Sequence, residues 1–150
     1  MYAQLNEFFT QNPISRSALQ HLKEGVPIGL VVPQEFEGAL FRQGAQIFLN
    51  QSPAKNPDVV FYVQKNSMER LLALKTTDVG EFGVEVLREY LTGGVRIHVL
   101  GSLWGLTTHG YLGIMKEAGP SFAKFLASHG VGGIGKVFDH ISKLRRKPGP

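Results

Sequence analysis

The chain has 150 residues, of which 43% are hydrophobic and 19% are charged, and its formal net charge is +4. This length suits one domain with a substantial core, and the composition excludes an intrinsically disordered chain. Because the sequence contains no cysteine, it also excludes disulfides, zinc–thiolate sites and thiol nucleophiles. The first residues have no basic segment followed by an apolar run, and no stretch approaches the ~20 apolar residues of a membrane span. We therefore expect a single cytoplasmic domain over residues 1–150.

The first part of the chain predicts one short helix and then a series of strands. Residues 15–23 have helical apolar spacing and end before Gly25 and Pro27. Short β-rich runs bounded by turn residues then predict strands at 28–32, 36–42, 45–50 and 58–64. Gly38 falls inside the second of these strands, where a glycine indicates a bulge or a close backbone approach.

The second part predicts helices around one further strand. We expect a helix over 67–74 capped by Ser67, and another over 78–91 ended by Gly93 and Gly94. Residues 95–100 alternate as a strand, and Ser102 opens a glycine-punctuated helix that continues past Tyr111. Two more amphipathic segments, 121–129 and 134–144, follow as a C-terminal extension. The expected apolar stripe of the 78–91 helix consists of Phe82, Val86, Leu87 and Tyr90.

One glycine-rich string, GVGGIGKV at 130–137, matches a dinucleotide fingerprint and nearly matches a phosphate-binding loop. Both motifs require a strand before the glycines, whereas the preceding FAKFLASH has helical spacing. Val137 also stands where a phosphate-binding loop needs Ser or Thr. We therefore interpret the string as a joint between two helices.

The titratable residues form no recognisable catalytic or metal-binding pattern. The five histidines stand in no HxH, HxxxH or HExxH arrangement, and no GxSxG supplies a serine nucleophile. Glu81, Glu85 and Glu89 share one helix face, which is typical of a solvated face. The basic residues form a tail rather than a stripe interleaved with aromatics, so a nucleic-acid partner is not expected. The sequence thus predicts no enzyme, no catalytic residue, no metal site and no cofactor.

Two segments carry a resemblance to a known family. These are 57–63 (PDVVFYV) and 91–101 (LTGGVRIHVLG), within the order leading helix, hairpin, strand, helices, strand and closing helix. In this order and in these motifs, residues 14–119 resemble the sterol carrier protein type-two (SCP2-like) family. The resemblance implies an α+β fold with a twisted, mainly antiparallel sheet of about five strands, covered by helices and enclosing an apolar cavity. It also implies non-catalytic binding or carriage of a fatty acyl chain, an acyl-CoA or a sterol-like lipid.

Apolar residues on the two helices that flank strand 95–100 are the expected ligand contacts. This set consists of Phe82, Val86, Leu103, Trp104, Leu106 and Met115. The glycines between the last four indicate close packing or a space kept open. The alternative is a relative whose cavity has closed, which serves as a protein–protein interaction module. The extension over 121–147 either caps the cavity or mediates association.

The basic tail predicts contact with an anionic membrane through Lys143, Arg145, Arg146 and Lys147. Each basic residue near such a surface contributes about 1 kcal/mol. Arg145→Glu combined with Arg146→Glu is therefore expected to weaken binding to anionic vesicles without unfolding the protein. Co-sedimentation with vesicles at low and moderate salt measures this. Equal sedimentation of the variant and the wild type would leave the tail only a structural cap.

Overall fold

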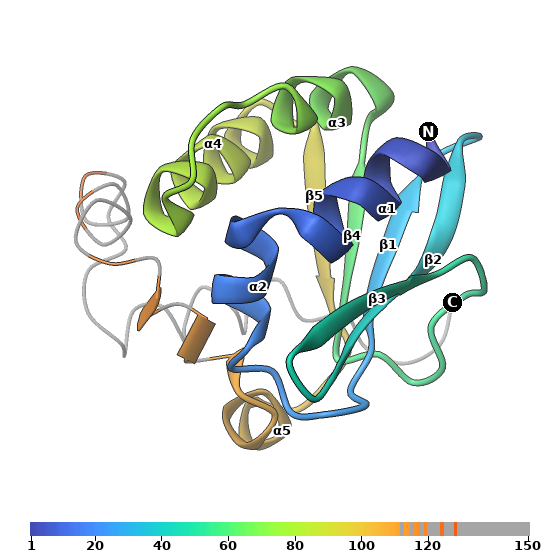
Figure 1. The fold of residues 1–150 in the computed structure, drawn as a ribbon, viewed down its shortest axis with the longest axis vertical. Helices are drawn as coiled ribbons and strands as arrows, with labels where there is room; N and C mark the ends of the chain where they lie inside the picture. The colour runs from blue at the N-terminus through green and yellow to red at the C-terminus, as the bar shows by residue number, and fades with distance from the viewer. Residues whose placement is uncertain (112, 115, 118, 120–123, 125–127, 129–150) are drawn as a thin grey trace.

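The chain forms a five-stranded sheet with helices packed against it (Figure 1). The computed structural model describes residues 1–111, 113, 114, 116, 117, 119, 124 and 128. Within these residues the strands are β1 (Ile28–Val32), β2 (Phe36–Gln43), β3 (Gln46–Asn50), β4 (Val59–Val63) and β5 (Val95–Val99). The helices are α1 (Tyr2–Gln11), α2 (Pro13–Leu19), α3 (Lys65–Leu72), α4 (Val79–Leu91) and α5 (Leu103–Thr108).

The strand order is β3-β2-β1-β4-β5, and the sheet is open rather than closed into a barrel. Three neighbouring pairs, β1–β2, β2–β3 and β4–β5, are antiparallel, and only β1–β4 is parallel. The predicted α+β class with a mainly antiparallel sheet of about five strands is therefore confirmed.

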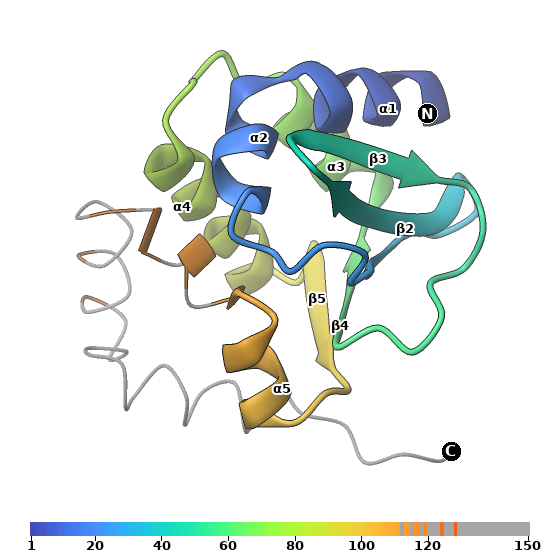
Figure 2. The same cartoon turned by 60° about the horizontal axis from the view of Figure 1, so that its bottom comes forward.

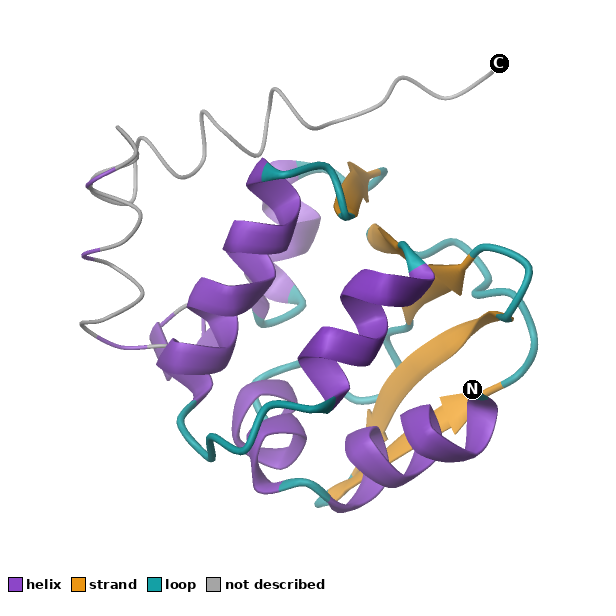
Figure 3. Cartoon of the chain, turned by 90° about the horizontal axis from the view of Figure 1, so that it is seen from above, coloured by secondary structure: helices purple, strands orange, loops and turns teal. Residues whose placement is uncertain are grey.

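The helices share one side of the sheet, where alternate strand residues form the core (Figures 2 and 3). Residues at i and i+2 of a strand point to the same face, so β1 contributes Ile28, Leu30 and Val32 to it. The helices meet this face with Leu5, Leu19, Met68 and Leu71. Where β4 begins and β5 ends, Leu106 of α5 packs on Val59 and Val99 in a second, smaller cluster.

Side-chain caps explain where several helices begin. Asn12 Oδ1 accepts a hydrogen bond from Ile14 N, and Pro13 occupies the first turn, so α2 begins earlier than the predicted 15–23. The helix α1 before it was not predicted. Asp78 caps α4 by accepting from Gly80 N and Glu81 N, which confirms the predicted start. Ser102 likewise caps α5 through Gly105 N.

Two predictions about helix boundaries were wrong, one about the start of α3 and one about the length of α5. Ser67 is not a cap but a buried residue inside α3, and its hydroxyl donates to Glu89 Oε2 at 2.7 Å. The predicted continuous helix from Ser102 past Tyr111 instead breaks after Thr108, because Gly110 adopts a φ of +97°.

Gly38 lies where β2 and β3 approach each other closely, as predicted. A Cβ at this position would overlap the backbone oxygen of Asn50 and the ring of Phe36. The absent side chain therefore lets the Phe36 ring fold over the strand into the core.

Candidate functional site

The inner face of β4 and β5 is less covered in its middle than at its ends. The register places Val63 beside Val95, Phe61 beside Ile97, and Val59 beside Val99. The four valines are all 6% exposed or less, whereas Phe61 and Ile97 are only half-buried. Phe61 and Ile97 therefore form an apolar strip that the described helices leave partly uncovered.

Tyr111 completes this strip. Phe61, Ile97 and Tyr111 are the half-buried residues that pack against both the large core cluster and the smaller cluster around Leu106. We name these three residues the apolar seam. The seam packs against two clusters of buried residues, and its own three side chains remain partly exposed.

Helix α4 borders β5 with a half-covered apolar face. Phe82, Val86 and Tyr90 pack against the large cluster but remain partly exposed, and Gly80 is the buried residue of this helix. The Phe82 ring also stacks on Phe8 of α1, with ring centroids 5.3 Å apart. Figure 1 shows α4 near the start of β5 and α5 near its end, so the seam lies between these two helices.

The structure places the predicted ligand-binding residues in different surroundings. Phe82 and Val86 contribute to the half-covered face of α4, whereas Leu106 is buried in the smaller cluster. Trp104 is 76% exposed. Leu103 begins α5, and Met115 lies outside the described residues. The binding role of this set remains a prediction.

The seam residues themselves were not among the predicted contacts. The alternation within 58–64 places Phe61 on the same strand face as Val59 and Val63, and the alternation within 95–100 places Ile97 on the same face as Val95 and Val99. The pairing of these two strands, which brings the residues side by side, is a tertiary feature. Tyr111 reaches the seam because the chain turns at Gly110, which the helical spacing did not indicate.

A polar group lies next to one end of the seam. His109 Nδ1 and Asp58 Oδ2 are 2.5 Å apart, and the Asp58 side chain is 14% exposed and the His109 side chain 30%. The backbone oxygen of Asp58 accepts hydrogen bonds from Leu100 N and Gly101 N, which fixes the residue at the entry to β4. The Tyr111 hydroxyl is buried and has no hydrogen-bond partner among the described residues. Burial and, to a lesser extent, the Asp58 charge raise the pKa of Tyr111.

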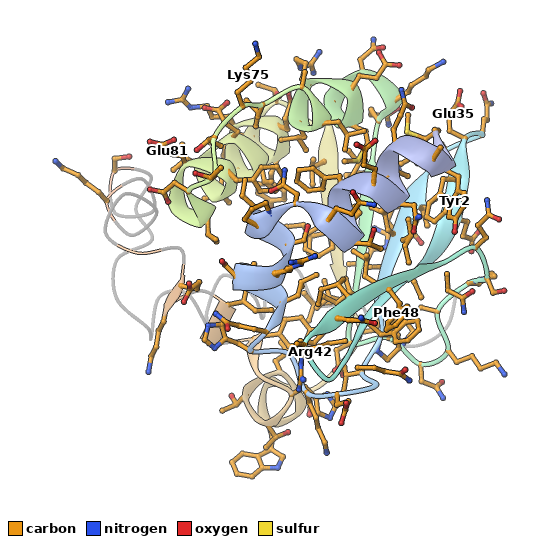
Figure 4. The ribbon with its side chains drawn as sticks, viewed as in Figure 1. Tyr2, Glu35, Arg42, Phe48, Lys75 and Glu81 are labelled. Atoms are coloured by element: carbon orange, nitrogen blue, oxygen red, sulfur yellow. The ribbon has the colours of Figure 1, made fainter. Side chains whose placement is uncertain are left out.

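Two surface hollows lie elsewhere, along the helices. One, of about 590 Å³, lies between α1 and α3 and is bordered by polar groups together with Phe8, Leu72 and Ala73. The other, of about 330 Å³, lies beside the loop before α4, where Glu81 borders it (Figure 4). Neither is bordered by a seam residue or by a described member of the predicted binding set.

Metal and membrane features can be assessed for the described part of the chain. There, no three His, Asp or Glu side chains gather in an arrangement suited to a metal ion. No described helix combines the length and apolarity needed to cross a bilayer. The predicted membrane contacts at Lys143, Arg145, Arg146 and Lys147 lie outside the described residues, as does most of the predicted extension over 121–147.

Comparison with known proteins gives a structural likeness but no match in sequence. No protein-family model matches the chain, and no curated protein matches it. Among solved structures, the chain is similar to "UbiJ-SCP2 Ubiquinone synthesis protein", with 14% identity over 78% of this chain and 90% of that chain and a TM-score of 0.45. The name of that protein includes SCP2, the family that the sequence motifs resemble.

Proposed function

We propose that this chain binds an apolar ligand along the seam formed by Phe61, Ile97 and Tyr111, beneath the half-covered face of α4. The supporting observation is the burial pattern of the β4–β5 pair, whose middle is more exposed than its ends. Covering a half-exposed aromatic or aliphatic side chain gains about 25 cal/mol per Å² of apolar area. A fatty acyl chain or a sterol-like lipid supplies that cover.

We further propose that binding is not followed by a reaction. The seam is hydrocarbon apart from the Tyr111 hydroxyl, a phenol that is protonated at neutral pH and whose pKa is raised further by burial and by Asp58. A protonated phenol is a poor nucleophile and a poor general base. The role that fits this chemistry is holding or carrying a ligand.

A substitution on α4 tests the site. Val86→Gln places a polar group at the half-covered face, and we expect it to weaken binding of the neutral fluorescent probe Nile red about tenfold, since burying a valine is worth about 1.5 kcal/mol. The matched control is Leu91→Gln on the same helix, because Leu91 is 53% exposed. Circular dichroism confirms that both variants fold. Equal affinity of the two variants would contradict a site at this face.

Trp104 offers a second measurement. Because its side chain is 76% exposed, its emission is expected to resemble that of an indole in water. If the ligand extends to α5, titration with a long-chain fatty acid shifts this emission to shorter wavelength. Binding detected by native mass spectrometry without any such shift would remove Trp104 from the predicted ligand contacts.

A protein-interaction role is the second candidate, and the outer face of the sheet favours it. On this face the rings of Phe41 and Phe48 stack with centroids 5.6 Å apart, and Phe48, on the edge strand β3, is 38% exposed (Figure 4). Exposed aromatic residues of this kind are common at protein interfaces. Gentle native mass spectrometry of protein purified from cells separates the two roles. A lipid adduct supports ligand binding, and a protein adduct lost in Phe48→Lys supports the alternative.

A further inference from the structure

Tyr111 is held in place by an unusually tight backbone approach. Gly110, just before it, has a φ of +97°, and a Cβ there would overlap the backbone oxygen of His21. Lys23 N donates to His109 O at 2.7 Å, and a Cβ at Gly113 would overlap the His21 side chain, so the segment between α2 and β1 packs on both sides of this turn. Tyr111 packs against both core clusters, as Phe61 and Ile97 do. These backbone contacts therefore fix the point from which the Tyr111 side chain extends.

The Tyr111 hydroxyl is buried while the ring is only half-buried. Its oxygen has no hydrogen-bond partner among the described residues. A buried polar group without a partner costs about 1–3 kcal/mol, and native proteins satisfy most such groups. The hydroxyl adjoins the apolar seam, so an oxygen atom carried by a seam ligand is a partner that relieves this cost.

The neighbouring charge restricts which oxygen fits. Asp58 is fixed by His109 Nδ1, and a Cβ at Gly101 would overlap its carboxylate, so the carboxylate is closely packed. Asp58 directly precedes Val59, whose cluster Tyr111 packs against, and is paired with His109, two residues before Tyr111, so its negative charge lies near the Tyr111 side chain. Burial first, and then this charge, raise the pKa of the Tyr111 hydroxyl. The hydroxyl thus remains a hydrogen-bond donor, and a carboxylate or phosphate placed against it would be repelled by Asp58.

The geometry points to Tyr111 as a specificity-determining residue, whose hydroxyl donates a hydrogen bond to an uncharged ketone, ester or ether oxygen of an otherwise apolar ligand. This inference rests on the proposed function, because it assigns the polar contact of the same seam. It names the ligand class as neutral lipids that carry an acceptor oxygen, in preference to free fatty acids.

Displacement of Nile red from the full chain by three chain-matched compounds tests the inference. For the wild type at pH 8, we expect 2-dodecanone to bind about tenfold more tightly than dodecane, the gain of one neutral hydrogen bond. Dodecanoate is expected to bind more weakly than the ketone. In Tyr111→Phe the ketone loses its tenfold advantage, while dodecane binding is unchanged. Tyr62→Phe, on the outer face of the sheet, is the matched control and keeps wild-type selectivity.

The outcomes separate the two proposals. If none of the three compounds displaces Nile red, or the probe does not bind, the proposed function fails. If all three bind but Tyr111→Phe retains the ketone preference, only the assignment of Tyr111 is overturned. Thermal unfolding adds an independent measurement: removing an unpaired hydroxyl leaves the ligand-free melting temperature unchanged or raised. A clear fall in Tyr111→Phe would indicate a structural hydrogen bond and would also overturn the assignment.

Discussion

Gly110→Ala is expected to lower the free energy of unfolding by about 3–5 kcal/mol. Two costs combine at this position. The φ of +97° is strained for any residue with a Cβ, and that Cβ would overlap the backbone oxygen of His21, which cannot rotate away. Urea unfolding followed by circular dichroism measures the change. Because the turn places Tyr111, the variant is also expected to bind Nile red more weakly.

Gly93→Ala separates the two costs. Gly93 has a similar φ of +86°, but a Cβ there would have no atom within 4 Å. It therefore bears only the backbone strain, about 1–2 kcal/mol. If the two variants are destabilised equally, the close approach between Gly110 and His21 contributes nothing, and the account of how Tyr111 is positioned fails.

The sequence predicts those elements whose boundaries are set by local chemistry. The limits of β1 follow from a β-branched run closed by Pro33, and those of α4 follow from the Asp78 cap and the left-handed Gly93. The resemblance of the order of elements to the SCP2-like family predicted the number of strands, and the sheet has five. Helix α1 was not predicted, although Leu5 and Phe8 are one helical turn apart in the sequence and both are buried.

The candidate site depends on contacts that local patterns do not contain. The spacing from Ser102 to Tyr111 is compatible with one helix, and the break occurs at Gly110, which has a φ of +97° and lies against the backbone of His21, far away in the sequence. Phe61 and Ile97 become neighbours only through strand pairing, and their half-burial depends on where α4 and α5 come to rest. The packing of Phe82 and Val86 against the core, by contrast, was predictable because the helical spacing places them on one apolar face of α4.

A cluster of three side chains joins α3 to α4 and to the turn before β5. Arg70 Nε lies 2.6 Å from Glu89 Oε1, and the Ser67 hydroxyl donates to Glu89 Oε2 at 2.7 Å. Gly94 packs directly against this pair, and Gly94 N donates to Glu89 O. The Arg70 guanidinium, followed by Ser67, lowers the pKa of Glu89 from 4.5 to about 2 despite the opposing effect of burial.

Glu89→Gln is expected to lower the free energy of unfolding by about 1–2 kcal/mol at pH 7. The shift in pKa corresponds to about 3 kcal/mol at most, and the exposure of Arg70, 62%, reduces this through solvent screening. Because the folded-state pKa lies below the unfolded value, the contribution is fully present above about pH 4.5 and is lost as the pH falls through about 2. The difference between variant and wild type should therefore shrink between pH 5 and pH 2.

Urea unfolding at a series of pH values measures this loss, and Glu85→Gln provides the control. Glu85 pairs with Arg88 on the same helix at 3.2 Å, but both side chains are more than a third exposed. Such a pair contributes less than about 0.5 kcal/mol, so its removal should have little effect at any pH. A Glu89→Gln deficit that persists unchanged at pH 2 would show that the glutamate acts through packing. A deficit that disappears there shows that its charge holds α3, α4 and the start of β5 together, and with them the half-covered face above the seam.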